Sequence, residues 1–259
     1  MTMVTKLTLL LLIGVNLLLN SGCEKVVEES KLNGPEFIKR DGICYRVNSD
    51  TPYSGEIIDY YDSGKIERII NYKDGKRDGS YLEYYESGQL RYTENYKDGD
   101  SYGIHKGFHE NGQVSSTGFT KNGIWDGLFE EYYEDGQLQS TGYFKNFEKE
   151  GLWEYYDENG RLSLSENYKN NVQHGLEKMY EDGKLKFSTN YKNGKEDGLS
   201  EWYNDNGQLI SSSNYKDGKE HGLTIWYDDN GQVRTIHNYK NGYLISNDGE
   251  PVSEEETEL

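Results

Sequence analysis

The sequence predicts an all-β protein: an elongated single antiparallel β-sheet of about eight tandem 24-residue β-hairpin repeats, a solenoid-like ribbon. Three observations predict this fold. Each unit opens with a glycine, each holds two short runs of alternating apolar and polar residues, and Asp-Gly or Asn-Gly dipeptides that favour tight hairpin turns recur. The opening glycines are Gly55, Gly79, Gly103, Gly127, Gly151, Gly175, Gly198 and Gly222. Their spacing is 24 residues, except for 23 between Gly175 and Gly198.

The composition favours a thin sheet over a thick core. Only 33% of the residues are apolar, yet there are 24 tyrosines and 30 glycines. A thin sheet can bury tyrosine rings and leave their hydroxyls in water. Low hydrophobicity and a net charge of −18 also fit disorder, but disordered acidic chains are poor in aromatic residues. The charge argues against binding nucleic acid or anionic lipid headgroups, and serves either solubility or a cationic partner.

Residues 1–22 are predicted to be a secretory signal peptide. Lys6 precedes an apolar run from Leu7 to Leu19 that is too short for a comfortable membrane span and ends in small residues. The sequence LNSGC that ends at Cys23 resembles the lipobox of bacterial lipoproteins, although Asn20 stands where an aliphatic residue is usual. The resemblance implies lipidation at Cys23 and an exported, membrane-anchored lipoprotein of the bacterial cell envelope. The alternative is ordinary cleavage that leaves Cys23 as a thiol.

The remaining segments are assigned around the repeats. Residues 23–40 are expected to be a tether, 41–54 a capping strand, 55–246 the eight repeats and 247–259 a disordered acidic tail. If Cys23 is lipidated, Cys44 is predicted to be a buried small apolar residue. If Cys23 is a free thiol, a Cys23–Cys44 disulfide is the alternative.

An aromatic pair divides the array into two parts. In the first four units two residues separate the pair from a turn glycine, as after Tyr84-Tyr85, whereas three do so in units five, seven and eight, as after Trp202-Tyr203. A one-residue change exchanges the faces of a strand. We therefore predict a compensating bulge or loop, with a change of twist or curvature near Gly151. In unit six a shorter first run without a longer turn is predicted to give the 23-residue spacing.

These units resemble MORN repeats (membrane occupation and recognition nexus), in their bacterial variant form. The matching features are the aromatic pair, a following x-x-Gly-x-Leu, and an Asn-Tyr-Lys-Asp/Asn-Gly-Lys tail, as in GSYLEYYESGQLRYTENYKDG. The resemblance implies an elongated antiparallel sheet that acts as a scaffold or binding module and sometimes dimerises. Some bacterial variant-repeat proteins are classed as antitoxins of toxin–antitoxin pairs. Units three and four depart from the pattern at Phe108-His109, Thr120, Phe144 and Phe147, by drift or because they carry a local binding surface.

No catalytic, metal or cofactor site is predicted. His105 and His109 share a strand face, but residues four apart on a strand lie about 13 Å from each other, too far to hold one ion. Acidic pairs recur with the repeat, as a solvated face would, and the calcium-loop and nucleotide-binding patterns are absent from the sequence. We therefore expect a protein that is not an enzyme.

The aromatic stripe is the strongest candidate for binding, although such rings also form the core of a thin sheet. The candidate binding residues are Tyr84, Tyr85, Phe108, Tyr132, Tyr133, Trp153, Tyr155, Trp202, Tyr203, Trp226 and Tyr227. The first hypothesis is an envelope-anchored protein-binding scaffold, with an antitoxin-like role in the sense above as its narrower form, and with a protein partner or a second copy of the chain. The alternative is a glycan- or peptidoglycan-binding module that uses stacked Tyr and Trp rings.

Overall fold

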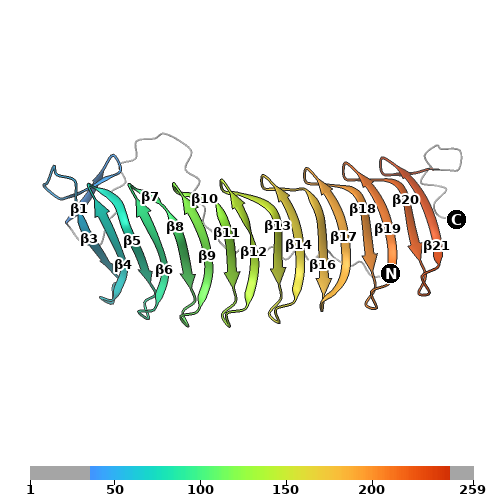
Figure 1. Ribbon diagram of the computed structural model, residues 1–259, viewed down its shortest axis with the longest axis horizontal. Helices are drawn as coiled ribbons and strands as arrows, with labels where there is room; N and C mark the ends of the chain where they lie inside the picture. Colours follow the sequence, from blue (N-terminus) through green and yellow to red (C-terminus); the bar gives the residue numbers. More distant parts are fainter. Residues whose placement is uncertain (1–35, 246–259) are drawn as a thin grey trace.

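The computed structural model describes residues 36–245, which form an all-β array without helices (Figure 1). Strands β1 (Phe37–Arg40) and β2 (Ile43–Arg46) form a separate hairpin, and β3 to β22 form one long antiparallel sheet. This confirms the predicted fold class. The predicted signal peptide, Cys23, most of the tether and the acidic tail lie outside the described residues.

Each of the eight units contributes two long strands. The first strands are β3 (Gly55–Tyr60), β5 (Lys76–Tyr84), β8 (Gly103–Phe108), β11 (Gly127–Tyr132), β13 (Glu148–Tyr156), β16 (Gly175–Glu181), β18 (Lys195–Tyr203) and β20 (Lys219–Tyr227). The second strands are β4 (Ile66–Lys73), β6 (Leu90–Lys97), β9 (Val114–Lys121), β12 (Leu138–Lys145), β14 (Leu162–Lys169), β17 (Lys184–Lys192), β19 (Leu209–Lys216) and β21 (Val233–Lys240). Four two-residue strands follow hairpin turns: β7 (Asp100–Ser101), β10 (Ile124–Trp125), β15 (Val172–Gln173) and β22 (Tyr243–Leu244).

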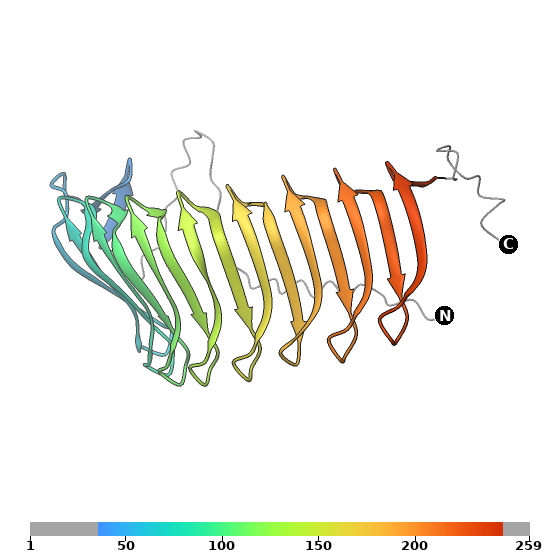
Figure 2. The ribbon, with the colours of Figure 1, turned by 45° about the vertical axis from the view of Figure 1, so that its right-hand side comes forward.

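Pairing connects only strands that are close in sequence. Hairpin partners such as β18 and β19 pair within a unit, and β17 and β18 pair between units. Figure 1 shows β3 and β21 at opposite ends of the sheet, and within residues 36–245 no register joins β3 to β21 or β22. Figure 2 shows that the ribbon curves along its length. A unit is therefore stabilised mainly by the two units beside it.

The opening glycine lies where the pairing between two units shifts. Gly198 has a φ of +120°, a conformation that residues with a side chain rarely adopt. Opposite it, the Asn190 side chain of the preceding unit donates from Nδ2 to the Leu199 carbonyl at 3.2 Å. A Cβ atom on Gly198 would lie 3.2 Å from Asn190 Cβ. The same donation recurs from Asn71 to Ser80, from Asn167 to Leu176 and from Asn214 to Leu223.

The turns that join one unit to the next confirm the predicted dipeptides. In the Asp-Gly and Asn-Gly turns both residues have left-handed φ values, as at Asp217 (+52°) and Gly218 (+82°). This pattern matches the type I′ hairpin turn. Unit four departs from it, because Phe147 replaces the glycine and still adopts a φ of +69°.

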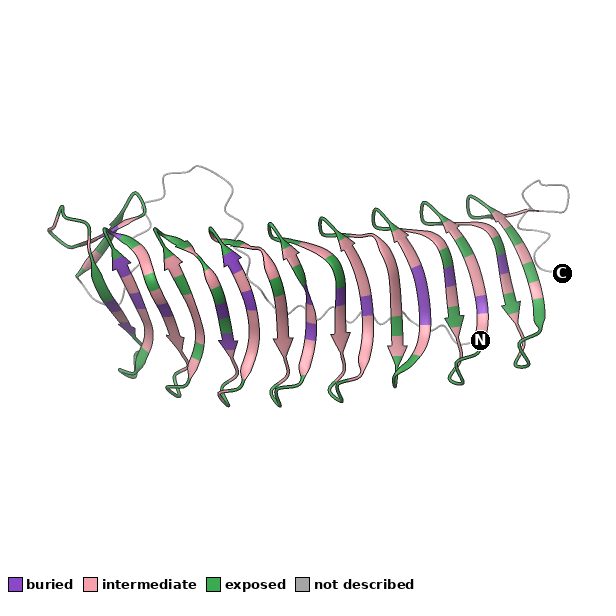
Figure 3. Ribbon diagram, in the orientation of Figure 1, coloured by how far each residue is buried: buried purple, intermediate pink, exposed green. Residues whose placement is uncertain are grey.

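Alternation gives the sheet two different faces. The core face carries, in units one to five, Ile57, Tyr81, His105, Phe129 and Trp153. The outer face carries the residue after each opening glycine, which in units three to eight is Ile104, Leu128, Leu152, Leu176, Leu199 and Leu223. Buried residues occupy short stretches along the strands, and exposed residues dominate the turns (Figure 3). No second layer covers either face within the described residues, so side chains on each face pack mainly against one another.

Aromatic rings fill the middle of the core face. Trp153 is only 2% exposed, and its ring centroid lies 5.0 Å from that of Phe144. Its ring also covers Gly142, where a Cβ atom would lie 2.1 Å from Trp153 Cδ2. Gly118 is covered in the same way by Trp125 and His105. Glycine on these strands therefore provides the space for a tryptophan on the neighbouring strand.

The compensating bulge predicted near Gly151 does not divide the array into two parts. A register shift in the first strand occurs in every unit at the equivalent place, for example between Asp59 and Tyr60 and between Trp202 and Tyr203. The position just before this shift holds, in chain order, Asp59, Glu83, Gly107, Glu131, Tyr155, Met179, Trp202 and Trp226. This position is acidic or glycine in units one to four, and apolar or aromatic from unit five onward. The aromatic pair therefore begins one residue earlier in the later units, while the pairing of the strands is unchanged. The predicted cause of a change in curvature at Gly151 is therefore absent.

Unit six is short for a different reason than predicted. Tyr180 pairs with Leu185 and Glu181 with Lys184, so only Asp182 and Gly183 form the turn. Four residues lie between Tyr180 and Leu185 in unit six, whereas five lie between the equivalent residues Tyr60 and Ile66 in unit one. The residue lost from unit six therefore comes from the turn, and the first strand keeps its length.

The N-terminal cap is a hairpin and not the single strand predicted for residues 41–54. Its Cys44 amide donates to the Gly75 carbonyl at 2.8 Å, so the hairpin docks on the first turn between units. Gly75 must be glycine here, because a Cβ atom would lie 2.2 Å from Ile43 Cγ2. Cys44 is a fully buried free thiol that packs with Ile57 and Ile70, which confirms its predicted burial.

The contact between Gly142 and Trp153 gives a specific prediction. Gly142→Ala should lower the free energy of unfolding by about 1–3 kcal/mol, because the added methyl group overpacks the tryptophan. In a Trp153→Ala background the same substitution should cost much less, since the ring that it strikes is gone. Chemical unfolding of the four proteins measures this coupling. An equal cost in both backgrounds would show that the Trp153 ring does not cover Gly142.

Candidate functional site

The structure distributes the predicted binding aromatics over both faces of the sheet and a turn. Tyr84, Phe108, Tyr132, Tyr203 and Tyr227 follow the register shift and lie on the outer face. Tyr85 and Tyr133 lie in the next turn. Trp153, Tyr155, Trp202 and Trp226 lie on the core face. The two rings of each aromatic pair therefore belong to different rows of side chains and do not stack along one groove.

The turn aromatics connect neighbouring units. Tyr85 Oη donates to the Phe108 carbonyl at 2.8 Å, and Tyr133 Oη donates to the Tyr156 carbonyl at 2.7 Å. In unit three the His109 ring makes the equivalent contact with the Tyr132 carbonyl at 2.8 Å. From unit five onward this position holds an acidic residue or asparagine, and Asp157 instead accepts hydrogen bonds from backbone amides of its own turn. These aromatics thus have a structural role.

The outer-face tyrosines that follow the register shift also have structural partners. Tyr132 Oη donates to Glu130 at 2.9 Å and Tyr203 Oη donates to Glu201 at 3.0 Å. Burial, and then the neighbouring Glu201 carboxylate, raise the pKa of Tyr203 above its ordinary value. The tyrosine hydroxyl therefore stays protonated at neutral pH and keeps donating to the carboxylate.

Lys149 fills an aromatic enclosure on the core face. Its Nζ lies 4.1 Å from the Trp153 ring centroid and donates to Tyr155 Oη at 2.8 Å. Burial lowers the pKa of Lys149, although the Glu166 and Glu131 carboxylates oppose this shift. The ring faces of Trp153 and Tyr155 are thus already engaged by a cation of the same chain, which argues against a role for them in binding a ligand.

Exposure separates the three tryptophans among the predicted candidates. Trp153 is buried, whereas Trp202 and Trp226 are each 47% exposed. Trp202 rests on Phe187, with a ring-centroid distance of 4.4 Å. Of the predicted core-face candidates, Trp202 and Trp226 are therefore the two that present aromatic surface to solvent.

An apolar patch on the outer face covers units three to five. We define the outer patch as Tyr102, Ile104, Phe119, Leu128, Tyr143 and Leu152. All except the half-buried Phe119 are exposed. Ile104 pairs with Phe119 and Leu128 pairs with Tyr143, so the side chains are neighbours. Large exposed apolar patches on soluble proteins mark interaction sites.

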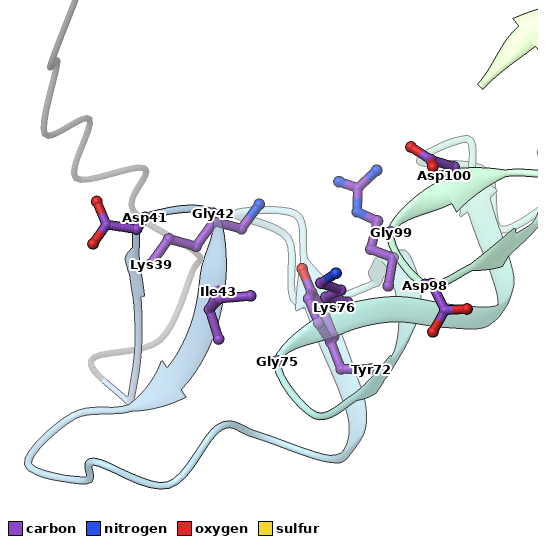
Figure 4. A pocket seen from close by; sticks show the side chains of 11 residues that line it. Lys39, Asp41, Gly42, Ile43, Tyr72, Gly75, Lys76, Asp98, Gly99 and Asp100 are labelled. Atoms are coloured by element: carbon purple, nitrogen blue, oxygen red, sulfur yellow. The ribbon is translucent and has the colours of Figure 1, made fainter. Parts of the chain in front are cut away.

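A charged cleft lies between the cap hairpin and the first two inter-unit turns (Figure 4). Its volume is ≈ 530 Å³, and its charged lining residues are Lys39, Lys76, Arg77, Asp41, Asp98 and Asp100. Burial and the nearby positive charge of Arg77 lower the pKa of Lys39. Because both signs of charge line the cleft, it has no clear preference for one class of ligand. Sequence reasoning missed it, since it forms only when the cap hairpin docks on the array.

The described residues give no sign of a metal centre or of a membrane-spanning helix. Among residues 36–245 no three His, Cys, Asp or Glu side chains gather in a way that could hold a metal ion. Over the same residues no helix is long and apolar enough to cross a membrane.

Comparison with protein families identifies the repeats. The MORN repeat variant matches eight segments, at residues 53–74, 77–98, 102–122, 125–146, 149–170, 173–193, 196–217 and 220–241. The chain belongs to the MORN repeat variant family. The eight matches confirm the number of repeats expected from the opening glycines.

Other comparisons add little to this MORN-repeat assignment. No match is found among curated proteins. Among solved structures, a GtfA/B complex bound to UDP and GlcNAc is similar over 43% of this chain and 22% of that chain, with 20% identity and a TM-score of 0.19. Choline binding protein F from Streptococcus pneumoniae, in crystal form II, is similar over 84% of this chain and 98% of that chain, with 14% identity and a TM-score of 0.17. Superpositions this loose say nothing about the ligand of this MORN-repeat protein.

The outer patch contains residues that sequence reasoning missed. The signal was present, because Phe119 and Tyr143 occupy the position that is asparagine in the other six MORN repeats. The departures noted from sequence, Thr120 and Phe144, are their neighbours and lie on the core face. To recognise the patch from sequence, one must know that the residue before the tyrosine of the Asn-Tyr-Lys segment faces outward.

His105 gives a pH-dependent prediction. It is 2% exposed, and burial lowers its pKa to about 4 from an ordinary value of 6.5. Below pH 6.5 the unfolded chain binds a proton that the folded chain does not accept until the pH approaches 4. Stability should therefore fall as pH decreases from 6.5 to 4, by about 3 kcal/mol from this group.

The comparison protein for this measurement is His105→Gln. Urea unfolding of both proteins between pH 7.5 and 4 separates the histidine from the carboxylates that titrate near the lower end. Above pH 5 the stability of the variant should change much less than that of the unmodified protein. Parallel curves for the two proteins would show that His105 titrates normally.

Proposed function

We propose that this MORN-repeat protein is a non-enzymatic scaffold that binds a protein partner through the outer patch. The observation that carries the proposal is the replacement of the outward-facing asparagine by Phe119 and Tyr143 in two adjacent units. There the change joins exposed aliphatic residues such as Leu128 into one apolar surface. Elsewhere the asparagine separates them, as Asn190 and Asn214 flank Leu199.

Acidic residues outnumber the exposed Lys106 on the outer face beside the patch, which favours a partner with a basic rim. Glu130 and Glu154 lie on the same face within units four and five, and Glu150 pairs with Tyr143. The whole chain carries a net charge of −18. Apolar contact at the centre with charge complementarity at the rim is the usual anatomy of a protein interface.

The asparagine found in the other six repeats provides a conservative substitution that tests the outer patch. Phe119→Asn/Tyr143→Asn restores the residue used by the other six repeats, so the variant should fold and can regain the asparagine-to-carbonyl hydrogen bond. We expect it to lose capture of the partner from extracts of the source cells, as measured by quantitative mass spectrometry. Leu223→Ser, which truncates an exposed leucine at the other end of the array, is the matched control and should retain capture.

Two results would contradict the proposal. Retention of the same stoichiometric partner by the double asparagine variant would exclude the outer patch as the interface. Absence of any stoichiometric partner with the unmodified protein would count against a protein-binding scaffold. An antitoxin-like role is a narrower proposal, which requires that the captured partner is toxic when produced alone and harmless when produced with this chain.

We propose further that the scaffold is exported and held at the bacterial cell envelope by a lipid on Cys23. The support is the sequence of residues 1–23, since Cys23 lies outside the described residues. Mass analysis of the N-terminal peptide from the membrane fraction tests this. A diacylated peptide that begins at Cys23 supports the anchor, and an unmodified thiol there contradicts it.

A further inference from the structure

An exposed apolar row follows the core face across units six to eight. It consists of Met179, Trp202 and Trp226, which are 40%, 47% and 47% exposed. All three occupy the position just before the register shift, which is acidic or glycine in units one to four. We call these residues the tryptophan row. It lies on the opposite face from the outer patch.

Trp202 packs on Phe187 at one side, and small neighbours leave the other side of its ring and the ring of Trp226 uncovered. Ser211 pairs with both Trp202 and Trp226, and Thr235 pairs with Trp226 on its other side. A serine or threonine side chain cannot cover an indole. In the middle of the array, by contrast, Trp153 packs against Phe144 and Phe129 and is buried. The same sheet therefore buries tryptophan in unit five and presents it to solvent in units seven and eight.

The spacing of the row is regular. Trp202 and Trp226 are on β18 and β20, separated by the single strand β19. Strands in a sheet are about 4.8 Å apart, so the two positions are about 10 Å apart along the ribbon. A matching ligand is extended and repeats over a similar distance, as a chain of linked pyranose rings does every two sugars.

The groups around the row select a neutral, hydroxyl-rich ligand. Ser200, Ser213 and Thr224 lie on the same face. At its side are Glu196 and Glu220, opposite Tyr191 and Tyr215. Over the described strands of units seven and eight, the core-face positions include no lysine or arginine. An anionic polymer would therefore meet mainly carboxylates and neutral groups, with Arg234 at the register shift beside Thr235 as a nearby cation.

We propose that the tryptophan row is a binding site for an extended, uncharged polysaccharide of β-linked pyranose units. The C–H faces of alternate sugars would lie on Trp202 and Trp226. Their hydroxyls would exchange hydrogen bonds with the partly exposed Ser213 and Thr235 hydroxyls and with the carboxylates, because Ser200, Ser211 and Thr224 are buried. Aromatic rings give such a site large contact area while remaining compatible with water. The proposal uses residues distinct from the outer patch and does not depend on the protein partner.

The test uses the purified full chain with two probes, the hexamers of β-1,4-linked N-acetylglucosamine and of β-1,4-linked glucose. Titration calorimetry gives affinity. We expect saturable binding of at least one hexamer, and at least a tenfold loss of affinity in Trp202→Ala/Trp226→Ala. The outer-patch variant Phe119→Asn/Tyr143→Asn should bind the hexamer as the unmodified protein does, which separates this proposal from the previous one.

A spectroscopic measurement covers the case in which the tryptophan variant fails to fold. Acrylamide quenches exposed indoles far more than buried ones, and Trp202 and Trp226 are exposed while Trp153 is buried. The bound hexamer should therefore protect the fluorescence of the unmodified protein from acrylamide.

Three outcomes would overturn the proposal. The first is no binding of either hexamer at millimolar concentration by the folded protein. The second is binding that persists in the double tryptophan variant or leaves quenching unchanged. The third is loss of a protein partner on substitution of the tryptophans without any glycan binding, which would make the row a protein contact.

Discussion

A one-layer sheet must obtain its stability from contacts between neighbouring units, and at four of the seven junctions here an asparagine side chain beside the opening glycine bridges two units. The opening glycine adopts a left-handed conformation where the inter-unit pairing shifts, and the asparagine of the preceding unit donates to the next carbonyl. The side-chain amide thus replaces a backbone donor that the carbonyl loses where the ladder shifts. The glycine has a positive φ in every unit, whereas the asparagine donation is present at four junctions, so the glycine is the feature common to all units.

A constant register allows the two faces to vary in chemistry. Along one position of the core face, the side chain changes from Asp59 and Glu131 to Tyr155 and Trp202 without any change in pairing. On the outer face, two asparagines are replaced by Phe119 and Tyr143. These replacements create the outer patch and the tryptophan row on opposite faces of one scaffold. The protein partner and the polysaccharide that we propose would therefore not compete for the same surface.

The sequence predicted the strands and the inter-unit turns well because their signals are local. Alternation in the second strands and left-handed residues such as Asp217 and Gly218 act within a few residues of chain. The register of the aromatic pair was predicted wrongly. In sequence, replacing the residue before the pair with an aromatic one looks the same as moving the pair by one residue. Pairing between strands resolves this, because Trp202 lies where Asp59 lies in the first unit.

The candidate site could be predicted only in part. Trp202 and Trp226 were among the predicted residues, but Trp153 was indistinguishable from them in sequence. Its burial depends on the glycine at position 142 in the neighbouring strand and on Phe144 beside it. The cap was predicted as one strand, although Asp41-Gly42 carries the same turn signal as the inter-unit hairpins, and only its docking on Gly75 depends on segments 31 residues apart.

The most direct test of a common register is to remove one whole unit. Deletion of residues 199–222 joins Gly198 to Leu223 and leaves every remaining junction intact. We expect a folded protein of lower stability, in which hydrogen exchange shows His105 and its neighbours as protected as before. Deletion of residues 199–221 leaves one residue more and should expose the amides of the joined units, since a one-residue slip exchanges the faces of a strand. Equal protection in the two deletions, or general loss of protection in the first, would contradict the account.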